Sequence, residues 1–253
     1  MLKMKAEKIY LSVIIPQYNE HSNLKKGLLH EMFSYLKSLS FRYEVLIVDD
    51  GSTDGSLKFL KENFARFPHL KIIEAKHGGK PLAIYEGLKD ASGQYVLFTD
   101  MDQSTPVKEL EKLLPHVPKY QAVIGSRGGK RNSATVLRKI AGFLFSGFRK
   151  LFILKQIDDT QCGFKLFEST VLKEVFPKLN ALSVKDVKGW SVSAFDVELL
   201  YLIQRAGHKI KEVRVNWHDE DVSITKNRKF FRESGDMLKQ VLMVVWREVK
   251  GEY

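Results

Sequence analysis

Residues 96–104 read Val96-Leu97-Phe98-Thr99-Asp100-Met101-Asp102-Gln103-Ser104, an apolar run that ends in two carboxylates separated by one residue. The run has the composition of a buried β-strand, which places Asp100 at the carboxyl end of that strand and Asp102 in the turn beyond it. Carboxylate oxygens are the hard ligands that Mg²⁺ and Mn²⁺ prefer. An isolated Asp-x-Asp pair is more often solvated than functional, so the rest of the chain decides between the two interpretations.

On either side of this stretch, apolar β-prone segments alternate with segments of helical periodicity. One helix is expected to be capped by Ser22 or Asn23 and to reach Leu36, and another to have Thr105 as its cap and Pro106 in its first position. The alternation predicts an α/β fold, a mostly parallel sheet flanked by helices. Strands are expected at residues 11–15, 43–48, 70–75, 95–99, 122–125 and 209–217, and a late helix at 195–206.

Four polar loops follow the first four predicted strands and should meet at one edge of the sheet, where such folds bind ligands. They comprise residues 16–20, 49–54, 77–80 and 100–104. Within the second loop, Asp54 is equally suited to cap the helix that follows.

The loops carry groups suited to a nucleoside diphosphate. Asp49 or Asp50, together with Glu20, can accept hydrogen bonds from a base or a ribose. The pair Gly78-Gly79 allows a ligand to approach the backbone closely, and Lys80 supplies a cation for phosphate. No Gly-x-Gly-x-x-Gly motif follows a strand, which argues against dinucleotide binding.

Composition narrows the class of protein. The 253 residues carry a formal net charge of +11, which predicts acidic partners such as nucleic acid, anionic lipid or phosphorylated substrates. The single cysteine, Cys162, excludes an internal disulfide and fits a reducing compartment, and no His/Asp constellation marks it as a nucleophile. Residues 1–10 lack the apolar core of a signal peptide, and no apolar run is long enough to span a bilayer, so we expect a soluble or peripheral protein.

Six motifs occur along the chain. In the first half they are Ser12-Val-Ile-Ile-Pro-Gln-Tyr-Asn-Glu20, Val48-Asp-Asp-Gly-Ser-Thr-Asp54 and Thr99-Asp-Met-Asp102. In the second half they are Ile124-Gly-Ser-Arg127, Asp159-Thr-Gln-Cys-Gly-Phe-Lys165 and Phe195-Asp-Val-Glu-Leu-Leu200. The first three resemble successive signatures of family 2 glycosyltransferases with the GT-A fold. The last three resemble its polyprenyl-phosphate branch, which includes dolichyl-phosphate mannose synthases and β-glucosyltransferases.

The resemblance implies a nucleotide-sugar site, in which Asp100 and Asp102 hold the metal and the diphosphate. The metal, Mg²⁺ or Mn²⁺, would be bound by Asp100, Asp102 and Ser104, the last at a position that is often Gln in mannose synthases. With Lys80, whose charge suits a phosphate, the residues expected to bind the nucleotide sugar are Pro16, Tyr18, Glu20, Val48, Asp50, Lys80, Asp100, Met101 and Asp102.

On the acceptor side, Arg127 and Arg138 match the arginines that bind the lipid phosphate in the family, and Lys226 matches a loop that closes over the diphosphate. The catalytic residues implied are Asp102, Arg127 and Lys226. The acceptor phosphate oxygen would attack the anomeric carbon from the face opposite the diphosphate and invert its configuration. A phosphate monoester with a second pKa of about 6 is already ionised at neutral pH, so no strong base is required.

Residues 136–155 place apolar side chains at helical spacing among lysines and arginines. Periodicity alone suits a helix at a membrane interface and a core-packing helix equally, and the resemblance favours the membrane. We expect a catalytic domain at 1–226, with this amphipathic helix within 134–155, and a C-terminal amphipathic helix within 227–253. The expected location is cytoplasmic, peripheral on the inner face of a membrane, with a membrane protein as a further candidate partner.

Three other functions stay open beside the transfer of a hexose to a polyprenyl or dolichyl phosphate. A nucleic-acid-binding protein is disfavoured because no recognised module is present, and a non-catalytic sugar-nucleotide sensor because Asp100 and Asp102 are intact. Transfer to a glycan hydroxyl is disfavoured because a Gln-x-x-Arg-Trp signature is missing. The motif at 159–165 and the pair Asn216-Trp217 favour UDP-glucose over GDP-mannose as the donor.

Overall fold

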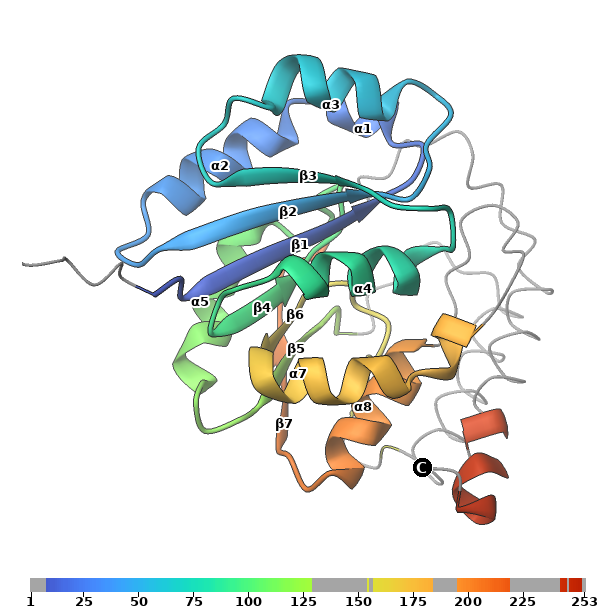
Figure 1. Cartoon of the computed structure of the whole chain (residues 1–253). Coiled ribbons are helices and arrows are strands. Elements are labelled where there is room, and N and C mark those ends of the chain that lie inside the picture. The colour runs from blue at the N-terminus through green and yellow to red at the C-terminus, as the bar shows by residue number, and fades with distance from the viewer. Residues whose placement is uncertain are drawn as a thin grey trace, which may run out of the picture.

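The alternating segments fold into one sheet with helices on both faces (Figure 1). The structure is a computed structural model, and it describes residues 8–128, 154, 157–183, 195–218, 242–244 and 246–251. Within these residues the strands are β1 (Leu11–Gln17), β2 (Tyr43–Asp49), β3 (Leu70–Glu74), β4 (Tyr95–Phe98), β5 (Ala122–Ser126), β6 (Lys165–Glu168) and β7 (Ile210–Arg214).

The spatial order of the strands is β3-β2-β1-β4-β6-β5-β7. Strands β1, β2, β3 and β4 pair in parallel, as do β5 and β7, whereas β6 is antiparallel to both of its neighbours. All strands except β6 therefore run in the same direction. The predicted mostly parallel sheet flanked by helices is confirmed.

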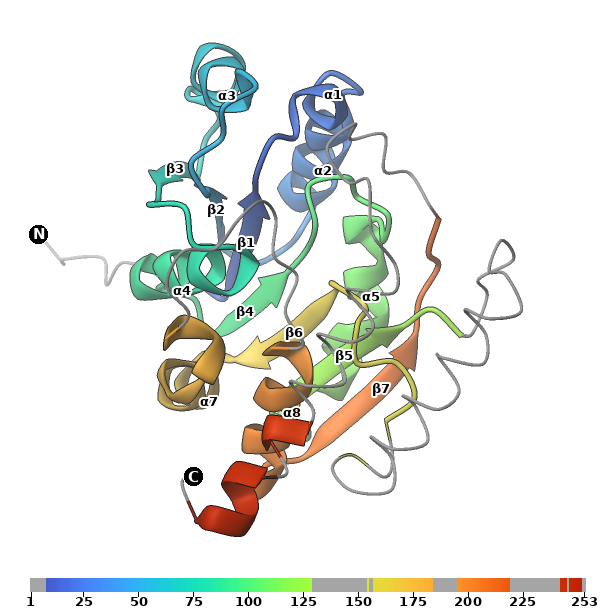
Figure 2. The same ribbon diagram turned by 90° about the vertical axis from the view of Figure 1, so that its right-hand side faces the viewer.

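Two helical layers enclose the sheet, as Figures 1 and 2 show from two sides. One layer holds α1 (His21–Leu24), α2 (Leu28–Lys37), α3 (Ser56–Phe64) and α5 (Leu110–Leu113), the other α4 (Lys80–Asp90), α7 (Ser169–Val175) and α8 (Phe195–Arg205). Short 3₁₀ turns add η1 (Val107–Glu109), η2 (Leu114–His116), η3 (Phe176–Lys178) and η4 (Asn180–Ser183). Alternate residues of β1 supply both layers, since Ile14 packs with α4 and Val13 and Ile15 pack with α2 and α3.

Two helix predictions near the site are wrong in detail. The helix expected from Ser22 or Asn23 to Leu36 is split, because Gly27 adopts a left-handed backbone with φ of 78° between α1 and α2. Pro106 does not begin a helix; it stays extended with ψ of 139° and precedes the 3₁₀ turn η1.

The strand β6 and the helix α7 were not predicted. β6 spans only four residues and begins with the buried Lys165, so neither its length nor its pattern marks a central strand. Its register joins the two parts of the sheet: Val96 of β4 and Ala122 of β5 both pair with Phe167. The ring of Phe167 is fully buried and lies 5.0 Å from that of Phe98.

Helical residues at 242–244 and 246–250 lie beside α8 (Figure 2). Glu248 bonds Arg205 of α8 at 2.9 Å, and Val244 is buried in the same core. The predicted helix at 136–155, and most of the one within 227–253, lie outside the described residues. In the part of the chain that the structure describes, no helix combines the length and the apolarity required to cross a membrane.

The position of β6 gives a first prediction. Phe167→Ala should lower the free energy of unfolding by about 3–5 kcal/mol, because it leaves a cavity between two strand pairs in the sheet. Val249→Ala, at a residue that is 82% exposed, is the control and should change that free energy by less than about 0.5 kcal/mol. Chemical denaturation measures both, and equal stability of the two variants would contradict the central position of β6.

Candidate functional site

Six parallel strands end at the same edge of the sheet, and the antiparallel β6 begins there. Loop 1 (residues 18–20), loop 2 (50–55), loop 3 (75–79) and loop 4 (99–106) follow β1, β2, β3 and β4 at this edge. Arg127 follows β5, and residues 159–164 lead into β6. The loops singled out from the sequence therefore meet, and the segment before β6 joins them.

Loops 1 and 2 are held together by hydrogen bonds between their polar side chains and backbones. Asp49 accepts hydrogen bonds from the amide of Gln17 and, at 3.0 Å, from the backbone N–H of Ser52. Asn19 accepts the N–H of Thr53 at 2.8 Å. These contacts make the two loops one surface at the end of the central strands.

Asp54 acts on helix ends. Its carboxylate accepts the N–H of Ser56, the first residue of α3, at 2.9 Å, and that of His21, the first residue of α1, at 3.1 Å. Burial raises the pKa of Asp54. The two backbone hydrogen bonds, together with one from the Ser56 hydroxyl, outweigh burial and lower the pKa of Asp54 below its ordinary value. Asp54 therefore binds the first N–H group of each helix, although the N-cap positions themselves are held by Glu20 and Gly55.

Asp50 joins loop 2 to loop 3. Its fully buried carboxylate accepts the N–H groups of Gly78 at 2.8 Å and Gly79 at 2.9 Å, and its Oδ2 lies 2.9 Å from Nδ1 of His77. Burial raises the pKa of Asp50, and these donors partly offset the rise. In this structure Asp50 positions loop 3, and its predicted contact with the nucleotide stays a prediction.

Tyr18 and Glu20 belong to loop 1. The ring of Tyr18 stacks on that of His77, with centroids 4.6 Å apart and planes at 23°. Glu20 is buried and accepts a hydrogen bond from the amide of Asn23 at 2.6 Å. An aromatic platform and a carboxylate beside the Gly78-Gly79 backbone are groups that can hold a base and a ribose.

Lys80 and Asp100 connect loop 3 to loop 4. The Lys80 ammonium lies 2.5 Å from Oδ1 of Asp100, and the Lys80 side chain is only 12% exposed. Burial opposes the ammonium charge, but Asp100, Asp196 and Asp102 raise the pKa of Lys80 above its ordinary value. The lysine is therefore charged and lies against the first carboxylate of the Asp-x-Asp motif.

Asp102 lies in the turn after β4. Its Oδ1 accepts the N–H of Ser104 at 2.9 Å, and the turn is closed by Gln103, whose φ of 49° is left-handed and whose amide bonds the Asp100 carbonyl at 2.7 Å. The carbonyl of Ser104 accepts the N–H of His218 at 2.8 Å. The backbone of Ser104 thus fixes the Asp102 side chain. The roles of Asp102 and Ser104 as metal ligands stay predictions.

The donor groups of loop 4 fit a divalent cation. Within the described ranges, no three His, Cys, Asp or Glu side chains come together as a metal site. Asp100 and Asp102 offer a pair of hard oxygen donors in one turn, which leaves coordination positions for phosphate oxygens. Mg²⁺ and Mn²⁺ both suit such a pair.

Arg127 is bound in two places by one carboxylate. Its Nε and Nη2 both lie 2.7 Å from the oxygens of Asp159, which also accepts the Arg127 backbone N–H at 3.0 Å. The guanidinium lies 5.8 Å from the ring centroid of Trp217. Burial opposes the Asp159 charge, but the arginine hydrogen bonds and charge lower the pKa of Asp159 to about 2.

A second buried ion pair lies behind the site. Lys165 of β6 is 1% exposed and donates to Asp196 of α8 at 2.6 Å and to the Cys162 carbonyl. Glu198, two residues further along α8, accepts the backbone N–H of Asn180 and so ties α8 to the segment before it. The charge of Asp196 is therefore balanced by Lys165. Cys162 is buried, and burial raises the pKa of its thiol.

Several residues expected to bind the nucleotide sugar have buried side chains. Pro16 lies within β1, Val48 is fully buried under α4, and Met101 packs in the apolar cluster with α5. Contact with a ligand through their main chains stays a prediction. Arg138 and Lys226 lie outside the described residues.

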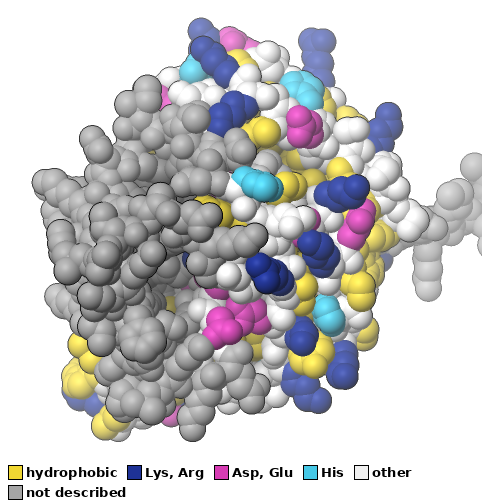
Figure 3. Space-filling model, turned by 180° about the vertical axis from the view of Figure 1, so that it is seen from behind, with side chains coloured by type: hydrophobic (Ala, Val, Ile, Leu, Met, Phe, Trp, Pro, Cys, Tyr) yellow, Lys and Arg dark blue, Asp and Glu magenta, His cyan; other side chains and the backbone are white. Residues whose placement is uncertain are grey.

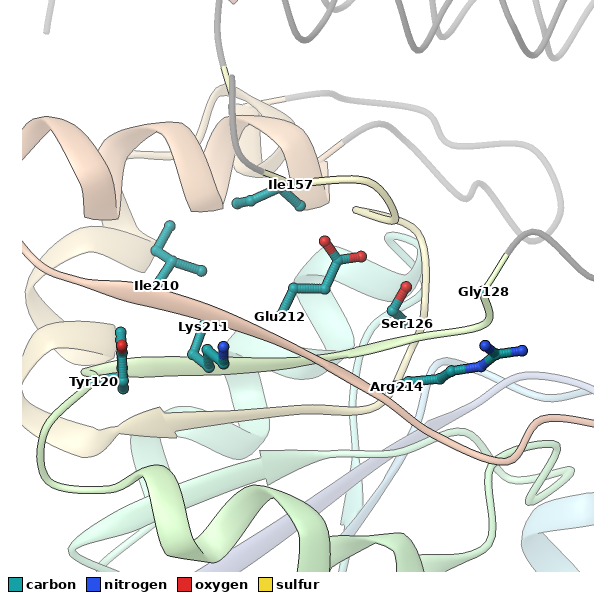
Figure 4. Close-up of a pocket in the computed structure, with 8 residues that line it drawn as sticks. All are labelled: Tyr120, Ser126, Gly128, Ile157, Ile210, Lys211, Glu212 and Arg214. Atoms are coloured by element: carbon teal, nitrogen blue, oxygen red, sulfur yellow. The ribbon is translucent and has the colours of Figure 1, made fainter.

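A pocket of about 440 Å³ lies along β5 and β7 rather than over the loops (Figure 4). Its Glu212 accepts the N–H groups of Asp158 at 2.7 Å and Asp159 at 2.8 Å. This carboxylate therefore supports the segment that carries the partner of Arg127. The residues that line the pocket are Tyr120, Ser126, Gly128, Ile157, Ile210, Lys211, Glu212 and Arg214.

The order and direction of the strands, and the helices on both faces of the sheet, define the class of protein: a GT-A fold. Residues 12–176 match the family model described as "Glycosyl transferase family 2". The chain belongs to this family and is a glycosyltransferase.

Curated relatives match over most of the chain. A dolichyl-phosphate beta-glucosyltransferase of Saccharomyces cerevisiae is 35% identical over 241 residues, covering 86% of this chain and 69% of the relative. One of Dictyostelium discoideum is 33% identical over 267 residues, covering 98% and 78%. One of Homo sapiens is 35% identical over 226 residues, covering 82% and 67%.

Solved structures share the fold. Glucosyl-3-phosphoglycerate synthase from Mycobacterium tuberculosis, in complex with Mn²⁺, UDP and phosphoglyceric acid, superposes with a TM-score of 0.60 at 20% identity, over 93% of this chain and 77% of that one. A mannosyltransferase from Pyrobaculum calidifontis, in complex with GDP-Man and Mn²⁺, gives 0.62 at 17% identity, over 96% and 65%.

The Arg127–Asp159 pair should make a contribution to the free energy of unfolding that depends on pH. Because the pKa of Asp159 is lowered to about 2, the pair stabilises the fold by about 2 kcal/mol above pH 4, and this is lost as the pH falls from about 4 through 2. Asp159→Asn should lower the free energy of unfolding at pH 7, and the difference should shrink below pH 4. Glu62→Gln, in an exposed pair with Lys58, is the control and should show no such dependence. A pH-independent difference for Asp159→Asn would contradict the assignment.

Proposed function

We propose that this chain transfers glucose from UDP-glucose to a dolichyl or related polyprenyl phosphate, with inversion at the anomeric carbon and with Mg²⁺ or Mn²⁺ bound by Asp100 and Asp102. One observation carries the proposal. Two sets of groups suited to phosphate lie at the same edge of the sheet. On one side are Lys80, Asp100 and Asp102, which suit a diphosphate and its cation, and on the other is Arg127, which suits an acceptor phosphate.

The donor side suits a nucleoside diphosphate sugar. The Tyr18–His77 stack and the carboxylate of Glu20 are the groups proposed to contact the nucleoside, and Lys80, which is paired with Asp100, is proposed to contact the diphosphate. A divalent ion bound by Asp100 and Asp102 would neutralise charge on the departing diphosphate. The names of the relatives, dolichyl-phosphate beta-glucosyltransferases, and the UDP and Mn²⁺ held by a structural neighbour support UDP-glucose as the donor.

The acceptor side suits a phosphate monoester. Arg127 presents a planar guanidinium fork, the geometry that binds phosphate through two hydrogen bonds. Asp159 binds Nε and Nη2 of this fork, so the N–H groups of Arg127 that remain are the ones proposed for the acceptor phosphate.

The reaction needs a positioned, ionised acceptor more than a base. One acceptor oxygen donates an electron pair to the anomeric carbon, the bond from that carbon to the diphosphate oxygen breaks, and UDP leaves with the bonding pair. The acceptor is already largely ionised at neutral pH, so no proton has to be removed in the step. Catalysis then consists of alignment by Arg127 and of charge neutralisation by Lys80, with Lys226 proposed to assist.

We include a peripheral location on the cytoplasmic face of a membrane in the proposal. A polyprenyl acceptor is anchored in lipid, and the single cysteine fits a reducing compartment. The helical residues 242–244 and 246–250 support it, because Leu242, Met243, Trp246 and Val249 are exposed apolar side chains, and Lys250 lies 3.8 Å from the Trp246 ring centroid. Exposed apolar side chains with adjacent lysines are typical of interfacial helices.

Nucleic-acid binding is supported less well. On the face shown in Figure 3, lysine and arginine side chains are dispersed among uncharged ones and do not form a continuous stripe. A basic stripe or patch is the usual footprint of such binding. Phosphorylated substrates and anionic lipid, the partners proposed here, are acidic and suit the net charge of +11.

The proposal predicts the effect of Asp102→Asn. With purified enzyme, Mn²⁺ and dolichyl phosphate, transfer of labelled glucose from UDP-glucose should fall at least about 100-fold, because charge on the leaving diphosphate is no longer neutralised. Wild-type enzyme should use UDP-glucose in preference to UDP-N-acetylglucosamine and GDP-mannose. Asp90→Asn, which alters an exposed surface pair with Lys71, is the matched control and should keep full activity. Substantial transfer by Asp102→Asn with unchanged metal dependence would contradict the assignment of Asp102 as a ligand of the cation.

The membrane location predicts the behaviour of a double variant. Trp246→Glu with Val249→Glu should reduce co-sedimentation with anionic vesicles, because it removes apolar side chains that are 52% and 82% exposed and adds repulsive charge. Binding of wild type should weaken as salt rises. Ser34→Glu with Asn63→Glu adds the same charge on α2 and α3 and should pellet like wild type. Equal pelleting of all three proteins would show that Trp246 and Val249 do not contact lipid.

A further inference from the structure

Gly163, in the segment before β6, lies directly against the carboxylate of Asp100. A Cβ atom built on Gly163 would be 2.0 Å from Oδ2 of Asp100, 2.7 Å from its Cγ and 3.1 Å from its Oδ1. The Asp100 carboxylate therefore occupies the space that any side chain at position 163 would take. Lys80 contacts the same carboxylate, at 2.5 Å from Oδ1, so Asp100 is confined by a cation and by a bare backbone.

The segment that presents Gly163 is itself held at both ends. At its start Asp159 binds Arg127 through two contacts of 2.7 Å, and its N–H is bound by Glu212. At its end Lys165 enters β6 and bonds Asp196 at 2.6 Å. We call residues 159–165 the bridging segment, because it contacts the acceptor arginine and the donor carboxylate.

We infer that Gly163 is a positioning residue for Asp100, and that the bridging segment sets where the proposed metal and diphosphate lie relative to Arg127. The inference rests on the proposed function, because it assigns Asp100 to the cation. Gly163 does not itself touch substrate; it acts through the carboxylate. Supporting groups of this kind typically change metal affinity or activity by about 10- to 100-fold when they are altered.

Local geometry makes the role of Gly163 separable from folding. The backbone at Gly163 is not in the left-handed region, so alanine is conformationally allowed there. What a methyl group meets is the end of the Asp100 side chain, which can rotate away. Gly163→Ala should therefore fold and displace the carboxylate by more than about 1 Å, a shift that can cost about 100-fold in rate.

The test measures Mn²⁺ binding rather than activity alone. Thermal unfolding of full-length wild type and Gly163→Ala is followed at saturating UDP while Mn²⁺ is titrated. The concentration that gives half of the melting shift should rise at least about 10-fold in Gly163→Ala. The shift caused by UDP without metal should stay unchanged. Transfer of glucose should fall about 100-fold.

Gly125→Ala is the matched control. A Cβ atom at position 125 would contact the same segment at other atoms, 3.0 Å from the Phe164 carbonyl oxygen and 3.1 Å from Cys162 Sγ, and Asp100 is not among its nearest neighbours. The Mn²⁺ half-saturation of Gly125→Ala should equal that of wild type. An equal shift in both variants would overturn the assigned contact and indicate a general distortion of the segment.

A double-variant cycle tests the contact without any ligand. Gly163→Ala should lower the melting temperature in the wild-type background and leave it unchanged or higher in Asp100→Ala, where the collision is removed. Equal costs in the two backgrounds would overturn the inference. If wild type shows no shift with UDP and Mn²⁺, the proposed function fails, but the cycle still decides the contact. If wild type shifts and Gly163→Ala titrates identically, only the positioning role fails.

Discussion

The carboxylate of Asp50 is the constraint on which the donor side of the site depends. It is fully buried at the end of β2, and it accepts both N–H groups that Gly78 and Gly79 present to it. A charge in this position is costly unless donors compensate it, so loop 3 has to adopt one conformation around it. That conformation starts α4 at Lys80, whose ammonium then reaches Asp100. One buried side chain thus sets the distance between the loops after β2 and β4.

Much of this arrangement could be predicted from local patterns. The apolar runs that became β1, β2, β4 and β5 are bounded by polar residues, and in a parallel sheet their carboxyl ends must share an edge. The convergence of Tyr18, Asp50, Lys80 and Asp100 therefore followed from strand order along the chain. The motif resemblance covered most of the domain, and the family assignment agrees with it.

Other features could not be predicted, because they depend on partners distant in sequence. Lys165 lies inside a four-residue strand and is balanced by Asp196 from another layer, and nothing local to either residue indicates this pair. Arg127 was expected to bind an acceptor phosphate, and its contact with Asp159 could not be foreseen because it is a tertiary contact across 32 residues. The break before α2 depends on the left-handed backbone of Gly27, which a helical apolar period conceals.

The antiparallel course of β6 ties the two sides of the site to one stretch of chain. Strands β5 and β6 are neighbours, with Ile124 opposite Lys165, so the chain leaves and re-enters the sheet at adjacent points of one edge. The residues that lead back into the sheet include Asp159, which binds Arg127, and Gly163, which lies against Asp100. A substitution at this point of re-entry is therefore pleiotropic, because it alters the surroundings of the proposed acceptor arginine and of the proposed donor carboxylate together.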